Sequence, residues 1–234
     1  MRAESPVAVV TGAGRGIGRA TAAAFAAEGY RVVVAEVRAT LGQRSAKALQ
    51  RSGAQALFLQ TDVANAASVQ RTVREVLRNL GRIDCLVNNA GVLRIGPLAS
   101  LAVPDLERML AVNLRGPLLM ARAVLPAMLR RGAGAIVNVA SALGKAGLGE
   151  YVTYCASKFG VVGMTEALAD ELDGKGVSVW AVCPGLVDTP MARLTRVLGA
   201  ERSHLIRPEA VAQTILELAT GRRRARSGSA IDVT

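Results

Sequence analysis

Histidine and aromatic residues are scarce in this chain of 234 residues, and their scarcity limits the chemistry that it can perform. Aromatic residues make up 3% of the chain, and His204 is the single histidine. A serine–histidine–aspartate triad is therefore excluded unless His204 itself acts, and we expect a solvated side chain there. The three cysteines, Cys85, Cys155 and Cys183, form no CxxC pair, so we expect packed thiols rather than a disulfide framework or a zinc site.

Long hydrophobic runs are also missing. No apolar segment approaches the roughly 20 residues that cross a bilayer, and residues 1–6 form a short polar tail rather than a secretory signal. We therefore expect a cytoplasmic protein with no membrane partner.

Negative charge is in short supply, with 18 Asp and Glu residues against 29 Lys and Arg residues and a formal net charge of +11. Such an excess favours a partner that carries negative charge. The basic residues are spread along the chain, however, apart from Arg222–Arg224 and Arg226, and no aromatic residue is interleaved there to stack on bases. We expect a solvated basic turn and no nucleic-acid partner.

The chain is rich in aliphatic residues and glycine: 51% of the residues are hydrophobic and 24 are Gly. Short apolar runs alternate with longer helical patterns, and the connections are too long for hairpins, so parallel strands joined by right-handed crossovers are expected. The predicted strands are 7–10, 31–35, 56–60, 85–88, 135–140, 177–183 and 230–233. The predicted helices are 16–28, 41–52, 68–80, 105–112, 116–130, 151–172 and 208–220. The pattern predicts an α/β fold over residues 1–234: one doubly wound, Rossmann-type domain with a parallel sheet of about seven strands and helices on both faces.

A glycine-rich turn, Thr11–Gly18, joins the first predicted strand to the first helix. Glycines there permit a tight turn and close approach of a pyrophosphate to the backbone, and the helix N-terminus offers free N–H groups. No Gly-Lys-Ser/Thr closes the turn, so a phosphate loop for ATP hydrolysis is disfavoured.

Glu36 stands at the end of the second predicted strand, about where a dinucleotide fold places an acid against the adenosine ribose. A carboxylate there repels a ribose 2′-phosphate and so favours NAD. Arg15 and Arg38 favour NADP instead, because their guanidinium groups could hold that phosphate. We give Glu36 the greater weight, although a solvated acid at a strand end remains the alternative.

Tyr154 and Lys158 lie four residues apart in the helix predicted over 151–172, so their side chains leave the same face. A cation that close would lower the tyrosine pKa towards working pH and create an acid–base pair. On spacing alone, a Tyr and a Lys one turn apart are far more often a surface contact than a catalytic pair. Tyr151 lacks a lysine four positions on, because Cys155 stands there, and we expect Cys155 to be a packing residue.

These motifs together resemble the short-chain dehydrogenases/reductases, in particular single-domain members with a TGxxxGxG turn. The resemblance covers nearly the whole chain. The matching positions are Thr11, Gly12, Gly16 and Gly18 with Arg15 and Ile17 in the same turn, Asp62-Val63, Asn88-Asn89-Ala90-Gly91, the tetrad Asn113, Ser141, Tyr154 and Lys158, and Pro184-Gly185 with Val187 and Thr189.

The resemblance implies an NAD(P)-dependent oxidoreductase acting on a secondary alcohol or ketone. Tyr154 would be the general acid/base, and Ser141 would bind the substrate oxygen. Lys158 would lower the tyrosine pKa and bind the nicotinamide ribose, and Asn113 would hold a water that links Lys158 to solvent. Thr189 would contact the nicotinamide carboxamide. The residues alone leave plainer roles open: Ser141 as a helix cap, Asn113 as a turn residue and Thr189 as a loop hydroxyl.

The resemblance further implies that Asp62-Val63 lies against adenine and that Asn89-Ala90-Gly91 lines the cofactor groove. It implies a substrate lid at residues 187–205, shorter here than in many members, with Met191, Leu194, Val197 and Leu198 as its apolar residues. A homodimer or homotetramer with helix-to-helix interfaces is implied as well.

Two alternative functions remain. One is reduction of a 3-oxoacyl thioester on an acidic carrier protein docked at Arg130-Arg131, although Asp170 occupies a position that is often basic in such reductases. The other is a nucleotide-binding regulator that has lost catalysis, which the intact tetrad disfavours.

Overall fold

Seven short strands form one parallel sheet in the computed structural model, which describes residues 5–192 and 205–234. The strands are β1 (Val7–Thr11), β2 (Arg31–Glu36), β3 (Ala56–Gln60), β4 (Cys85–Asn88), β5 (Gly134–Val139), β6 (Val177–Pro184) and β7 (Ala230–Val233). Their order is β3-β2-β1-β4-β5-β6-β7, and every neighbouring pair runs parallel. The order reverses between β1 and β4, where a sheet of this kind opens a crevice at the carboxyl ends of its strands.

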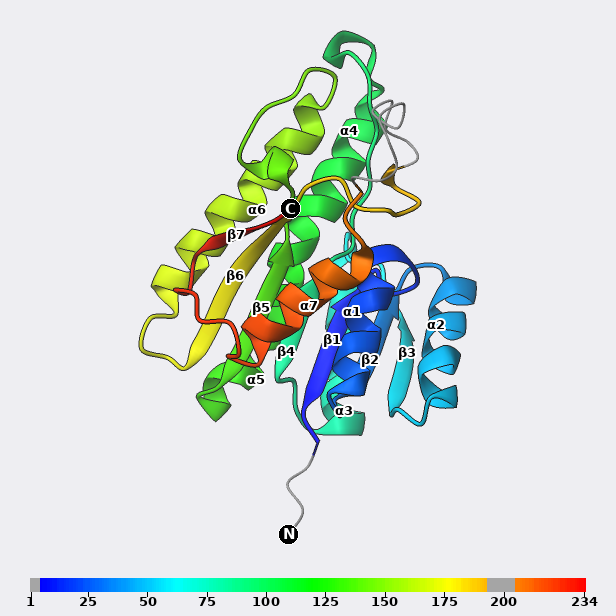
Figure 1. The fold of residues 1–234 in the computed structure, drawn as a ribbon, viewed down its shortest axis with the longest axis vertical. Coiled ribbons are helices and arrows are strands. Elements are labelled where there is room, and N and C mark those ends of the chain that lie inside the picture. Colours follow the sequence, from blue (N-terminus) through cyan, green and yellow to red (C-terminus); the bar gives the residue numbers. More distant parts are fainter. Residues whose placement is uncertain (1–4, 193–204) are drawn as a thin grey trace.

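Helices cover both faces of the sheet, so the predicted doubly wound α/β fold is confirmed (Figure 1). One face packs against α1 (Gly16–Ala27), α2 (Ala39–Arg51) and α7 (Pro208–Ala219), and α1 and α7 lie side by side in front of the sheet. The other face packs against α3 (Ala66–Leu80), α5 (Gly116–Arg131) and α6 (Val152–Glu171). The central strands are buried on both faces, as their continuous apolar runs predict.

The largest difference from the predicted elements lies before α5. Two separate helices were expected over 105–112 and 116–130, but α4 (Val103–Leu110), a π-helical turn (Ala111–Arg115) and α5 follow one another without a break. Gly116 donates to the carbonyl of Ala111, five residues back, and Pro117 has no N–H to bond the carbonyl of Asn113. The missing donor explains why an α-helical turn gives way to a wider one at Asn113.

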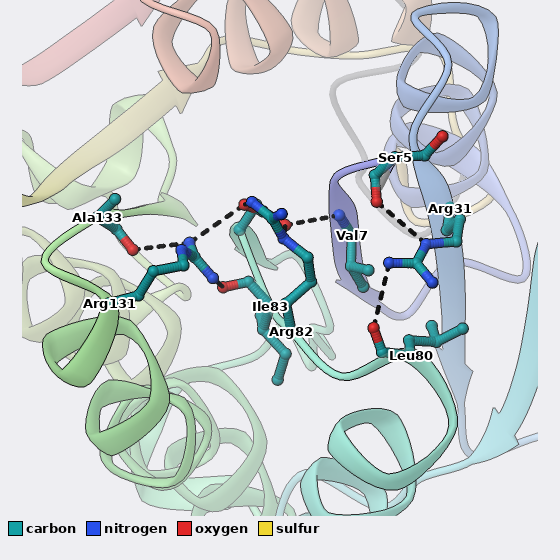
Figure 2. Close-up of polar contacts among 9 residues, drawn as sticks. Ser5, Val7, Arg31, Leu80, Arg82, Ile83, Arg131 and Ala133 are labelled. Atoms are coloured by element: carbon teal, nitrogen blue, oxygen red, sulfur yellow. Dashed lines mark hydrogen bonds and ion pairs between the residues drawn. The ribbon is translucent and has the colours of Figure 1, made fainter. Parts of the chain in front are cut away.

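Asp84 ties the amino edge of the sheet together, and its partners Val7, Arg82 and Arg131 are labelled in Figure 2. Its carboxylate accepts from the N–H of Val7 at 2.8 Å and from two nitrogens of Arg82 at 2.9 and 2.6 Å. Arg131 lies 3.2 Å from the same carboxylate and donates to the carbonyls of Ile83 and Ala133. The chain entering β1, β4 and β5 is thereby fixed by one partly buried charge cluster.

Among residues 5–192 and 205–234, the structure contains no helix that is long and apolar enough to cross a membrane. The predicted cytoplasmic location stays a prediction. We propose that residues 1–234 form a single domain, and the one sheet that all seven strands share supports this. Of the predicted lid, Leu194, Val197 and Leu198 lie outside the described residues, as does His204.

Candidate active site

A groove of about 760 Å³ opens at the carboxyl ends of the strands, across the point where strand order reverses. It brings together almost every site residue predicted from the sequence. Those that line it are Gly12, Arg15, Gly16, Ile17, Glu36, Arg38, Asp62, Val63, Asn89, Ala90, Gly91, Ser141, Tyr154, Lys158, Pro184, Gly185, Val187 and Thr189. Gly18 and Asn113 do not line the groove, but each contacts a residue that does.

The glycine turn forms one end of the groove. Gly12 and Gly16 have positive φ angles of 63° and 54°, and a Cβ on Gly12 would lie 2.8 Å from the Cα of Ala90. Arg15 provides no side-chain cap to α1, and the first turn of α1 contains no acidic residue. The N–H groups of that turn therefore remain available to a phosphate, as a dinucleotide requires.

Thr11 and Asn89 hold the turn against the end of β4. The backbone N–H groups of Asn89 and Ala90 donate to the Thr11 hydroxyl, and the Asn89 amide donates to the carbonyls of Thr11 and Gly12. Gly18 packs so tightly on Asn89 and Gly12 that a Cβ would collide with both. Gly18, predicted as a cofactor-binding residue, thus serves helix-to-strand packing.

Glu36 is 5% exposed, and its carboxylate faces the glycine turn. One oxygen accepts from the N–H of Gly14 and the other from the N–H of Arg38, both at 3.1 Å. The pKa of Arg15 is lowered by partial burial and by Arg38, and Glu36 partly offsets this. The three charged groups predicted to select the cofactor therefore lie within electrostatic reach of one another.

Asp62 and Val63 lie farther along the same wall. The Asp62 carboxylate accepts from the N–H of Ala64, while Val63 is buried against Gly116, where a Cβ would lie 2.9 Å from the valine side chain. The start of α5 therefore braces the wall predicted to contact adenine.

Tyr154, Ser141 and Lys158 meet at the middle of the groove. Ser141 follows β5 and caps a short 3-10 turn by accepting from the N–H of Leu143, and its side chain also hydrogen-bonds Tyr154. The Lys158 ammonium lies 5.6 Å from the centre of the Tyr154 ring and donates to the carbonyl of Val139 at 2.8 Å. Ser141 is thus both a cap and a partner of the tyrosine hydroxyl.

The predicted lowering of the Tyr154 pKa is not observed in the protein alone. Burial raises the pKa of Tyr154 to about 12, and the hydrogen bond from Ser141 offsets only part of the rise. Burial also lowers the pKa of Lys158 to about 8. The lysine fails to depress the tyrosine pKa because its ammonium is directed at Val139 and is itself destabilised by burial.

Asn113 acts as a clamp in the π-helical turn. Its side-chain oxygen accepts from the N–H of Val92, and its nitrogen donates to the carbonyl of Val92 and to the hydroxyl of Ser157. Ser157 in turn donates to the carbonyl of Tyr154. The side-chain nitrogen of Asn113 is thus occupied. A water bound to Asn113 would use the backbone carbonyl of Asn113 instead, because Pro117 has no N–H to bond that carbonyl.

The segment after β6 closes the other side of the groove. Gly185 donates to the carbonyl of Val233, and Val187 pairs with Ile206. The Thr189 hydroxyl accepts from the N–H of Ala192, and a Cβ on Gly16 would lie 3.2 Å from the Thr189 side chain. Thr189 therefore serves as a loop hydroxyl and also faces the glycine turn.

Several functional positions escaped the sequence interpretation. Tyr151, passed over for lacking a lysine partner, lines the groove beside Tyr154 and is 8% exposed. Further lining residues are Leu93, Leu143, Leu148 and Met191, together with Arg108 on α4. Of these only Met191 was singled out in the sequence, because their loops have no periodicity that reveals which side chain faces inward.

Two other expectations concern the three cysteines and the arginine pair Arg130-Arg131. Cys85, Cys155 and Cys183 are free, buried thiols, as predicted. Carrier docking at Arg130-Arg131 stays a prediction, and the Arg131 guanidinium is bound to Asp84 and to the carbonyls of Ile83 and Ala133 at the amino edge of the sheet.

A doubly wound sheet, a glycine turn and a serine, tyrosine and lysine in one groove define a dehydrogenase of the Rossmann type. The family model for short chain dehydrogenases matches residues 6–197, and the chain belongs to that family. It is an oxidoreductase of alcohol or carbonyl groups, and its family uses NAD(P)(H).

Relatives with different substrates resemble the chain. D-threitol dehydrogenase of Mycolicibacterium smegmatis is 44% identical over 81% of this chain and 73% of its own length. The 3-oxoacyl-[acyl-carrier-protein] reductase of Thermotoga maritima is 35% identical over 100% of this chain and 98% of its own. The crystal structure of levodione reductase superimposes with a TM-score of 0.91 at 30% identity, covering 97% of this chain and 95% of that one.

Proposed function

We propose that the protein catalyses NAD(P)-dependent interconversion of a secondary alcohol and a ketone, with Tyr154 as the general acid/base. One observation carries the proposal: Tyr154 and Ser141 line the same groove as the glycine turn, and no side chain caps the N-terminus of α1 that follows this turn. A dinucleotide seated on that turn would extend towards Tyr154, where a substrate oxygen can meet both hydroxyls.

The glycine turn would hold the pyrophosphate, Glu36 the adenosine ribose, and Asp62-Val63 the adenine ring. Lys158 would bind the nicotinamide ribose, and Thr189 the carboxamide. The bound nicotinamide supplies hydride transfer. The protein's own residues supply orientation and the proton.

Tyr154 would donate its proton to the ketone oxygen, which Ser141 holds by a hydrogen bond. Since the pKa of Tyr154 is raised to about 12, the hydroxyl is protonated at neutral pH and is ready to act as an acid. In the reverse direction the tyrosinate must form, and a charged Lys158 close to it would favour that state.

We further propose that NAD is preferred. The buried Glu36 carboxylate would repel a 2′-phosphate more directly than the exposed Arg38 side chain could attract it. NADP use would require Arg15 and Arg38 to outweigh Glu36.

A second candidate is reduction of a 3-oxoacyl thioester, favoured by 3-oxoacyl-[acyl-carrier-protein] reductases that match nearly the whole chain. Rates with 3-oxoacyl thioesters on and off the carrier would test it. Equal rates would remove any role for carrier docking.

A homodimer or homotetramer remains part of the proposal. Apolar side chains on the outer surfaces of α5 and α6 support it, since Leu118, Leu129, Val152 and Phe159 are between 41% and 48% exposed.

The decisive variant is Tyr154→Phe. It should abolish turnover of a screened alcohol or ketone, read by nicotinamide absorbance, while cofactor affinity measured by fluorescence stays within a few-fold of wild type. Turnover that survives the change would exclude Tyr154 as the acid/base. If wild type turns over no substrate at all, a non-catalytic regulator becomes the better interpretation.

A further inference from the structure

The groove differs sharply between its two ends in the distribution of charge. Arg15, Glu36, Arg38 and Asp62 line the end with the glycine turn, and Lys158 lies at the reacting centre. Beyond Tyr154 the wall is apolar, formed by side chains that pack around the tyrosine: Leu93, Leu143, Tyr151 and Met191, with Leu148 nearby. Arg108 is the one other charged residue that lines the groove within the described part of the chain.

Arg108 lines the groove from α4. It lies one helical turn before Val112, which also lines the groove, so the two residues share a helix face. The helix is held against the apolar wall next to it, because the N–H of Arg94 contacts the sulfur of Met109 at 3.4 Å. This contact joins the helix segment that carries Arg108 to the segment that carries Leu93.

The charge of Arg108 is not compensated by its neighbours. Asp105, one turn earlier on α4, forms an ion pair with Arg94 at 3.3 Å. The Arg108 guanidinium has no hydrogen bond or ion pair with any residue in 5–192 or 205–234. A guanidinium without a partner at the rim of an apolar cavity is a ready site for an anionic group of a ligand.

We infer that Arg108 binds the carboxylate of the substrate, which is therefore an oxo acid or hydroxy acid with an apolar chain between its two functional groups. The inference rests on the proposed function, since it assigns the substrate of the same groove. The guanidinium offers two parallel N–H donors that match a carboxylate, and the chain would cover the apolar wall. In the reaction the carbonyl carbon gains the hydride, its oxygen gains the Tyr154 proton, and the carboxylate is unchanged.

A neutral polyol fits this groove poorly. Each of its hydroxyls would lose hydrogen bonds to water on entering, and the apolar wall returns few of them. The substrate of this chain should therefore differ from the polyol named for its relative D-threitol dehydrogenase.

The test compares 4-oxopentanoate and 5-oxohexanoate with their methyl esters, and adds D-threitol as a neutral polyol. Wild type should prefer the acids over the esters by about 10- to 100-fold in kcat/KM, the factor expected for a hydrogen bond to a charged group. The Arg108→Gln variant should remove that preference through KM, and Arg108→Lys should restore part of it. Arg51→Gln, at an exposed position in the last turn of α2, is the matched control for charge and should keep the acid-to-ester ratio within about twofold of wild type.

A binding measurement separates the two proposals. Hexanoate, which has no carbonyl to reduce, should bind wild type saturated with cofactor in a calorimetric titration and bind Arg108→Gln at least about tenfold more weakly. Any of three results would overturn the role of Arg108. These are an acid-to-ester ratio of one in wild type, faster turnover of D-threitol than of the acids, and equal hexanoate binding by both proteins. Loss of the proposed function would instead show as no turnover of any substrate by wild type, whatever the hexanoate titration gives.

Discussion

Replacing the buried lysine by methionine, Lys158→Met, should make the cofactor-free protein more stable while abolishing turnover. The Lys158 side chain is 5% exposed, and burial lowers its pKa from 10.5 to about 8. At about 1.4 kcal/mol per pH unit, that displacement means that the charged form destabilises the fold by about 3 kcal/mol near pH 7. Methionine has a similar shape and no charge, but it loses the hydrogen bond to Val139, worth about 1 kcal/mol. The expected net gain is about 2 kcal/mol.

The pH dependence gives this prediction its sharpest test. Because the folded-state pKa lies below the unfolded one, the unfavourable contribution is complete below about pH 8 and disappears as the pH rises to 10.5. Urea unfolding followed by circular dichroism at several pH values should therefore show the advantage of the variant shrinking across that window. Lys145→Met is the control: Lys145 is 35% exposed and paired with Asp232, so its removal should change stability by less than about 1 kcal/mol. A variant less stable than wild type at pH 7, or a difference that does not change between pH 8 and 10.5, would refute the reasoning.

Three further substitutions test other parts of the structure. Asn113→Ala should lower unfolding free energy by about 1–3 kcal/mol in thermal or urea melts, because both backbone polar groups of Val92 lose their buried partner; an unchanged stability would show that water replaces the clamp. Glu36→Gln keeps an acceptor but removes the charge, so the ratio of kcat/KM for NADPH to that for NADH should rise about tenfold, and an unchanged ratio would remove Glu36 from cofactor choice. Asp84→Asn should cost about 2 kcal/mol in urea unfolding and leave KM for the cofactor unchanged, since its bonds to Arg131 lie at the opposite edge of the sheet; a changed cofactor KM would contradict that separation.

Local sequence patterns were enough to predict the fold. The strands are short apolar runs, and α2, α3 and α4 carry a clear helical period of apolar residues, so neighbours in the sequence specify these elements. The regular alternation then allows little but parallel strands with crossovers, and the groove follows at their carboxyl ends. The π-helical turn could not be predicted in this way, because Pro117 is equally compatible with the first turn of a new helix.

The arrangement of partners within the groove needed the folded chain. Tyr154 and Lys158 share a helix face, as their spacing requires, yet the structure directs the ammonium to Val139 on another element and leaves the tyrosine pKa high. The same holds for charges: the sequence shows arginines throughout, but only packing decides that Arg131 is bound to Asp84 while Arg108 has no such partner.

The sequence by itself thus determined the class of fold, the glycine turn and the order of the motifs, because these depend on residues close together in the chain. Tertiary structure decided which buried groups share hydrogen bonds, how far each pKa moves and which arginines have an acidic partner. Those quantities depend on burial and on contacts between residues such as Asn113 and Val92, or Lys158 and Val139, that are far apart in sequence and meet only when the sheet is complete.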